Sequence, residues 1–111
     1  MSFEEREKEI NDLYPRGYRF IRCINMYRDI VGDHSSRFNI EIFLLNDSGE
    51  EARIVACDCI DFSIGNVNNM LAAFVEVFDV SKDQIDGAKY KIVESENNLF
   101  SALCLDFKVI V

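Results

Sequence analysis

The chain has little of the chemistry on which most active sites depend. Its 111 residues include one histidine, no tryptophan and one proline, and its five glycines are scattered without a phosphate-binding loop. The histidine, His34, lies in the stretch Gly32-Asp33-His34-Ser35-Ser36. Catalytic Ser-His-Asp triads assemble from distant segments, because adjacent residues cannot point at one another in the required hydrogen-bond chain. We therefore predict a protein that is not an enzyme, with no catalytic residue, no cofactor and no metal.

Long hydrophobic runs are missing as well. No stretch approaches the roughly 18 apolar residues that a membrane-spanning helix needs, and the first residues, Met1-Ser2-Phe3-Glu4-Glu5, lack the apolar segment of a signal peptide. The expected location is cytoplasmic, where cysteines stay reduced. The length leaves room for one domain, so residues 1–111 are predicted to form a single domain, and a hydrophobic fraction of 49% supports a folded core.

Positive charge is scarce, above all in the second half. Lys and Arg total 12 against 20 Asp and Glu, a net charge of −8. Residues 56–111 hold nine acids, four lysines and no arginine. The seven arginines all lie in the first half, where cross-strand pairing with acids is the expected arrangement. An acidic field repels nucleic acid and anionic membranes and attracts cationic partners. The prediction is no nucleic acid, no membrane and a basic protein partner.

The N-terminal segment has the pattern of a short helix. Ser2 with Glu5 fits a capping box, and Phe3, Ile10 and Leu13 fall near one face. The residue before a proline avoids helical backbone geometry, so the helix has to end ahead of Pro15. A helix over residues 3–13 is predicted.

The next fifty residues alternate between apolar and polar positions, which is typical of strands. Strands are predicted from residue 18 to 31, from 38 to 44 and from 53 to 62, with a hairpin turn at residues 46–49, Asn-Asp-Ser-Gly. The three strands are predicted to form an antiparallel meander.

Residues 66–80 allow two interpretations. Asn66 could cap a helix in which residues recur at helical spacing: Val67, Leu71, Phe74 and Phe78. The richness in Val and Phe nevertheless favours a pleated surface. We predict a loop at residues 65–69 and a strand over about 72–80, with the helix as the alternative. A closing hairpin is predicted from strands at 90–94 and 99–111, joined through Glu96-Asn97-Asn98. The predicted class is α+β, mostly β: a short N-terminal helix and about six mainly antiparallel strands in a curved sheet or small sandwich.

Four cysteines leave three interpretations open. In an extended strand, Cys57 and Cys59 would share one face, with Asp58 on the other. Cys23 and Cys104, on other predicted strands, could meet them. Zinc sites usually take a pair of ligands spaced by two to four residues on a turn, so this spacing makes a poor chelate. Packing as small hydrophobes is favoured over a metal site or a redox pair.

Several segments together resemble small bacterial β-rich proteins of the toxin-immunity type. The segments are Ile54-Val55-Ala56-Cys57-Asp58-Cys59-Ile60-Asp61-Phe62, Asn66-Val67-Asn68-Asn69, Tyr90-Lys91-Ile92-Val93-Glu94 and Phe100-Ser101-Ala102-Leu103-Cys104. The resemblance covers about half of the chain and includes no invariant catalytic motif. It implies an immunity protein, an antidote that binds and blocks one cognate toxin domain. An acidic chain suits a basic toxin, because charge complementarity raises the association rate.

Within that hypothesis, the expected contact acids are Asp58, Asp61, Glu94 and Glu96, which lie on or beside predicted strands in the acidic half. Two hypotheses of other classes stay open. One is a general interaction module or homodimer that pairs through an exposed strand edge. The other is a small enzyme or ligand-binding domain, which needs a deep pocket with convergent polar groups.

Overall fold

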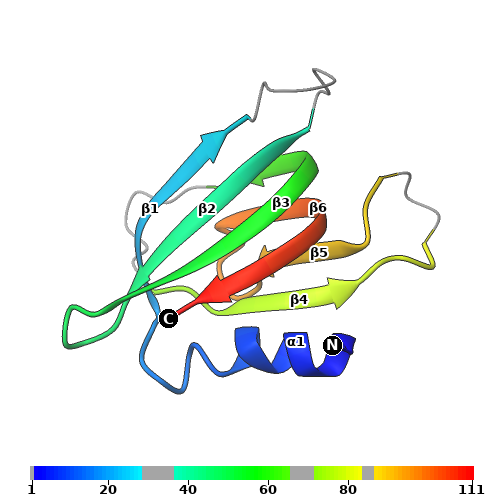
Figure 1. Ribbon diagram of the computed structural model, residues 1–111. Coiled ribbons are helices and arrows are strands. Elements are labelled where there is room, and N and C mark those ends of the chain that lie inside the picture. Colours follow the sequence, from blue (N-terminus) through cyan, green and yellow to red (C-terminus); the bar gives the residue numbers. More distant parts are fainter. Residues whose placement is uncertain (1, 29–36, 66–71, 84–86) are drawn as a thin grey trace.

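The computed structural model describes residues 2–28, 37–65, 72–83 and 87–111. Within them one helix precedes six strands (Figure 1). The helix is α1 (Phe3–Asn11), and the strands are β1 (Phe20–Tyr27), β2 (Phe38–Leu45), β3 (Glu51–Ile64), β4 (Val75–Asp79), β5 (Tyr90–Glu94) and β6 (Phe100–Ile110). The predicted class is confirmed, and the strands form one curved sheet rather than a two-sheet sandwich.

Helix α1 begins as predicted and ends two residues early. The Glu5 N–H donates to the Ser2 hydroxyl at 3.3 Å, which caps the first turn. At the other end, the Leu13 N–H bonds to the Ile10 carbonyl three residues back. This tighter bond leaves Leu13 in a turn ahead of Pro15 rather than in the helix, although its side chain is buried.

The strand order is β1-β2-β3-β6-β5-β4, and every pair of neighbours is antiparallel. The meander of the first three strands is confirmed, and so is the hairpin of β5 and β6. The Asn46 side chain organises the turn between β2 and β3 by accepting the N–H groups of Ser48 and Glu50 at 3.0 and 2.8 Å. Because β6 rather than β4 lies beside β3, two meanders of three strands join through these long strands.

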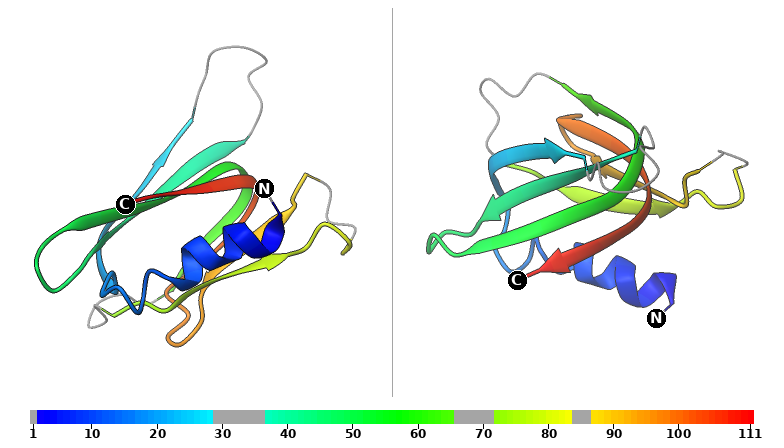
Figure 2. Two further views of the ribbon diagram at one scale, coloured as in Figure 1. Left: turned by 60° about the horizontal axis from the view of Figure 1, so that its bottom comes forward. Right: turned by 45° about the horizontal axis from the view of Figure 1, so that its top comes forward.

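The sheet is strongly curved (Figure 2), and the edge strand β1 contacts the segment that precedes the other edge strand, β4. An isolated bridge joins Phe20 to Ala72, and the Ala73 N–H donates to the Arg19 carbonyl at 2.6 Å. These bonds connect the beginning of β1 to the segment that leads into β4. Helix α1 packs beside β4 and β6. The largest fully buried apolar side chains are Ile10, Ile40, Ile42, Leu44, Ile54, Ile92 and Leu99, together with Phe107 at 2% exposure.

Two predicted elements are shorter in the structure. Strand β4 covers Val75–Asp79 of the predicted 72–80, and Val75 and Val77 are buried on the same face as Ile92. The strand interpretation is therefore confirmed for these residues, because alternate side chains enter the core. Strand β1 covers Phe20–Tyr27 of the predicted 18–31, of which residues 29–31 lie outside the described residues. Most of the predicted loop at 65–69, and the segment with His34, lie outside the described residues.

Arg6 fastens α1 to the sheet. Its guanidinium donates to the Phe107 carbonyl, lies 4.3 Å from the centre of the Phe107 ring and forms an ion pair with Asp106 at 2.5 Å. Its side chain is 20% exposed. Burial lowers the pKa of Arg6, but the hydrogen bond and charge of Asp106 outweigh burial and leave the pKa raised.

The Arg6→Ala variant is expected to lose about 2 kcal/mol of unfolding free energy, because it removes a charge-assisted hydrogen bond, an ion pair and ring contacts together. Urea denaturation at neutral pH measures this loss. The matched control is Lys8→Ala, on the same helix. Lys8 forms an exposed ion pair with Asp12, and such a pair contributes about 0.5 kcal/mol or less. Equal losses in the two variants would show that Arg6 is only a surface charge.

Candidate functional site

A bulge in β3 changes the direction of the Cys57-Asp58-Cys59 segment. Phe38 faces Cys59 and Ile40 faces Ala56, so two steps along β2 match three along β3. Asp58 takes up the extra residue with a φ of 54°, a left-handed conformation that Asp tolerates better than most residues. The prediction that both thiols share one face is therefore wrong. Cys59 is buried in the core, whereas Cys57, which precedes the bulge residue, is half-buried.

Two of the four cysteines pack in the core. Cys59 and Cys104 face one another on β3 and β6, and both are fully buried. The hydrogen bond with Cys59 and the burial of the thiol raise the pKa of Cys104 far above its ordinary value, so it stays protonated. Cys23 is exposed on β1. No three Cys, His, Asp or Glu side chains of the described residues are grouped as metal ligands.

The side of the sheet that points away from the core presents two rows of side chains across β3, β6, β5 and β4. We call these two rows the outer face. Strand register places Asp61, Leu103, Lys91 and Phe78 in one row, and Ser63, Ser101, Val93 and Glu76 in the other. None of the eight is buried, whereas residues between them on the strands, such as Val77, Ile92 and Ala102, enter the core. Asp61 thus lies on an accessible surface.

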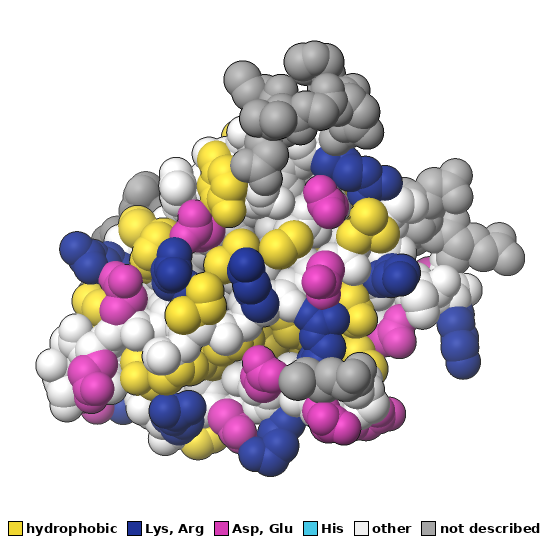
Figure 3. Space-filling model, viewed as in Figure 1, with side chains coloured by type: hydrophobic (Ala, Val, Ile, Leu, Met, Phe, Trp, Pro, Cys, Tyr) yellow, Lys and Arg dark blue, Asp and Glu magenta, His cyan; other side chains and the backbone are white. Residues whose placement is uncertain are grey.

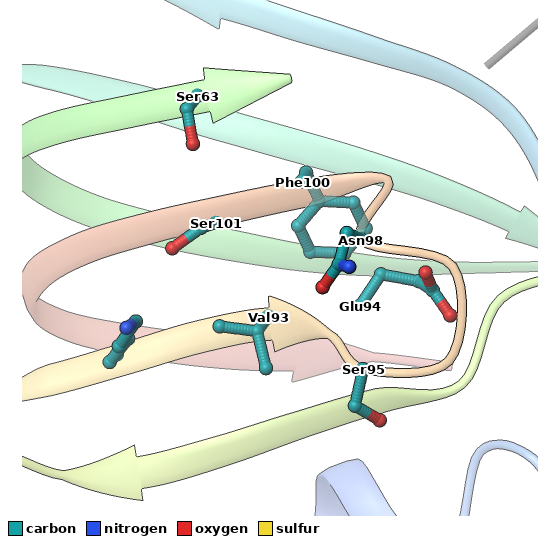
Figure 4. Close-up of a pocket in the computed structure, with 8 residues that line it drawn as sticks. Ser63, Val93, Glu94, Ser95, Asn98, Phe100 and Ser101 are labelled. Atoms are coloured by element: carbon teal, nitrogen blue, oxygen red, sulfur yellow. The ribbon is translucent and has the colours of Figure 1, made fainter. Parts of the chain in front are cut away.

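A shallow pocket of about 390 Å³ opens on this outer face, at the end near the β5–β6 turn (Figure 4). Its lining includes Ser63, Ser101, Asn98 and Lys91, which offer hydroxyl, amide and ammonium groups. Ser63 lies two residues after Asp61, and Ser95, also in the lining, directly precedes Glu96. The predicted acids Asp61 and Glu96 are thus close in sequence to lining residues of the pocket, and neither of them lines it. The polar groups of the lining can form hydrogen bonds to a partner.

Glu94 is the correction among the predicted contact acids. It is 1% exposed, and its carboxylate turns toward the β5–β6 loop (Figure 4). The carboxylate accepts four backbone N–H groups, those of Phe74, Glu96, Asn97 and Leu99, at 2.9–3.1 Å. Glu94 is thus a structural residue that holds the turn and the start of β4, and it is not available to a partner.

Asp58 is itself the bulge residue, and it does not line the pocket. Its carbonyl accepts a hydrogen bond from Arg37 at 3.4 Å, and its N–H donates to the Asn39 side chain at 3.1 Å. Its own side chain is exposed. Asp58 therefore lies at the margin of the outer face, whereas Asp61 belongs to one of its rows.

The arginines are largely matched with acids elsewhere. Cross-strand pairing is confirmed for Arg53, which contacts Glu41 at 2.9 Å. Arg19 pairs with Asp47, and Arg22 with Glu51. The face seen in Figure 3 accordingly shows basic and acidic side chains intermixed over apolar ones. Within the described residues, the carboxylates of Asp58, Asp61, Glu76 and Glu96 have neither an ion pair nor a hydrogen bond. The unpaired acids therefore extend over the outer face and its margins.

Comparison with protein families decides what kind of protein this is. The family model described as Immunity protein PIM8 matches residues 5–110. The chain belongs to this family. The resemblance to toxin-immunity proteins, predicted from segments covering about half of the chain, thus holds over nearly its whole length. No curated protein and no solved structure matches the chain. No helix of the described residues is long and apolar enough to cross a membrane.

As a PIM8 immunity protein, the chain has an immunity function, and its surface is the place to look for a toxin contact. Sequence reasoning missed the outer-face residues Ser63, Lys91 and Ser101, because serines and lysines on strands are unremarkable. It also passed over Phe78, which is 46% exposed at the β4 end of the outer face. The strand pattern did contain a signal. Val75 and Val77 occupy the apolar positions of the strand, so Phe78 is an aromatic residue at a position that is usually polar, which makes it a candidate contact residue.

Proposed function

We propose that this PIM8 immunity protein acts by binding alone and blocks a basic toxin domain with its outer face. The observation that carries the proposal is the separation of charges. Arg6, Arg19, Arg22 and Arg53 are ion-paired, whereas the acids of the outer face and its margins have no cation bound to them in the described structure. Lys91 is the cation of the two rows.

Different residues of this surface attract the partner and hold it in place. The unpaired acids Asp61, Glu76 and Glu96 attract a cationic partner from a distance and disfavour acidic ones. Phe78 offers an aromatic anchor of the kind found at the centre of protein interfaces. The pocket beside Ser63 and Ser101 supplies hydrogen-bonding groups that fix orientation. Such a surface binds a folded partner without chemical change to it.

A growth-rescue assay tests the proposal. The C-terminal region of the protein encoded immediately upstream is expressed in cells with and without this chain. We expect toxicity that disappears only when this chain is present, together with a stable complex of the two purified proteins. An upstream product that is harmless, or that kills in the presence of this chain as well, would remove the basis for that toxin as partner.

A further inference from the structure

One edge of β4 is unused by the sheet. Phe74 accepts a hydrogen bond from the Ser95 N–H, and Val80 donates to the Lys89 carbonyl, both at 2.9 Å. Even-numbered residues of this segment thus direct their backbone groups toward β5. Because these groups alternate between the two sides of a strand, Val75, Val77 and Asp79 direct theirs to the opposite edge. Within the described residues, no strand pairs with that edge beyond the single bridge at Ala72.

A groove of about 360 Å³ lies along this edge, between β4 and α1. It is lined by Glu7 and Asn11 from α1 and by Phe74, Glu76, Val77 and Phe78 from β4. Figure 1 shows α1 running beside β4 on the side away from β5. The Val77 side chain is buried in the core at 2% exposure, so it is the Val77 backbone that borders the groove. The groove therefore combines aromatic walls, two carboxylates and backbone groups that lack a strand partner.

The negative charge of this groove is uncompensated among the described residues. Glu7 and Glu76 are both half-buried, and within the described residues neither carboxylate forms an ion pair or a hydrogen bond. Two partly buried carboxylates near unbonded carbonyl oxygens favour a donor-rich cation. The guanidinium of arginine fits best, since its five N–H groups bind carboxylates in pairs and its plane stacks on aromatic rings.

We infer that this groove receives an arginine side chain of the toxin, held by Glu7, Glu76 and the free backbone edge of Val77, with its stem against Phe78. The inference rests on the proposed function, and Glu76 and Phe78 join the groove to the outer face. A second copy of the chain is disfavoured as occupant, because pairing two β4 edges would bring the same uncompensated acids together. The other edge strand, β1, carries Arg22 and no acid, so it does not attract a cation.

Neutral variants of unchanged size test the groove. Glu7→Gln with Glu76→Gln is expected to weaken binding of the upstream toxin domain about tenfold or more, because two charge-assisted contacts are lost. The matched control, Glu4→Gln with Glu9→Gln, removes the same charge from exposed positions of α1 that do not line the groove. It should change affinity less than about threefold. Titration calorimetry gives the dissociation constants, and thermal melting checks that both variants stay folded.

A second probe does not depend on the toxin. Chemical shifts of the Glu7, Glu76 and Val77 amides are followed as a capped Gly-Arg-Gly tripeptide, or its Gly-Glu-Gly counterpart, is added. If the arginine peptide shifts these amide signals and the glutamate peptide does not, the groove is supported as an arginine site. Failure of the toxin domain to bind would then contradict only the proposed function. If the groove variant and its control weaken toxin binding equally, the arginine site in the groove is contradicted and the proposed function stands. If the toxin domain does not bind and the peptide causes no shifts, the groove and the proposed function are both overturned. If the wild-type chain is a dimer and the groove variant is a monomer, the groove binds a second copy of the chain.

Discussion

The Glu94→Ala variant is expected to lose about 3–5 kcal/mol of unfolding free energy, a large part of the stability of a domain of this size. Removal of the carboxylate leaves four backbone N–H groups without their acceptor, at Phe74, Glu96, Asn97 and Leu99. The Leu99 side chain is fully buried, so water cannot replace the lost bond there without opening the core. Urea unfolding, followed by circular dichroism, measures the change.

Two further variants separate the hydrogen bonds of Glu94 from its charge and position. Glu94→Gln keeps the volume but presents an amide donor to N–H groups that need acceptors, so its stability should fall between wild type and Glu94→Ala. Glu96→Ala removes an exposed acid from the same turn and should change stability by less than about 0.5 kcal/mol. A Glu94→Ala protein as stable as the Glu96→Ala protein would mean that the turn forms without this carboxylate.

Charge reversal at Asp61 and Glu96 is expected to slow association with the toxin domain about tenfold or more at low salt. Asp61 lies on the outer face, and Glu96 directly follows the pocket residue Ser95. Both side chains are exposed and have no ion pair within the described structure. The Asp61→Lys, Glu96→Lys protein is compared with wild type by stopped-flow mixing over a range of salt concentrations. The difference should shrink as salt rises, because screening weakens long-range attraction.

The control for this prediction changes the net charge by the same amount on another surface. Glu4→Lys with Glu9→Lys places the new cations on α1, and both positions are exposed. A rate that falls equally in both proteins would show that total charge, rather than the outer face, steers the toxin. Asp58 is tested separately as Asp58→Asn, since Asn tolerates the left-handed backbone at the bulge and Lys would strain it. Its marginal position predicts a smaller effect on the association rate than at Asp61.

Burial of charged residues was beyond sequence reasoning, and Glu94 shows why. In the sequence it is one acid among nine in an acidic half, next to Ser95 and Glu96 in a turn. Nothing local distinguishes it from Glu96, which is exposed. The difference arises because three N–H groups of the β5–β6 turn and the N–H of Phe74, just before β4, converge on the Glu94 carboxylate. A carboxylate is the side chain that satisfies such a cluster of donors.

The bulge at Asp58 was equally hidden. Strand periodicity assumes one residue per step, and a single inserted residue reverses the faces of everything beyond it. Cys57 and Cys59 therefore lie on different sides of β3, although their spacing in the sequence predicts one face. The groove beside β4 depends on a further distant contact, because Glu7 and Glu76 are far apart in the chain and meet only where α1 packs along the sheet edge.

The sequence by itself determined the elements and the character of this immunity protein. The capping residue Ser2 set the start of α1, alternation set β2 and β3, the Asn46 turn joined them, and the acidic surplus pointed to a basic partner. These features depend on residues within a few positions of one another. The tertiary structure alone decided the pairing of β3 with β6, the burial of Glu94 and the two rows of side chains on the outer face. Register and burial depend on which distant strands pair, and the periodicity of residues along the chain does not determine that pairing.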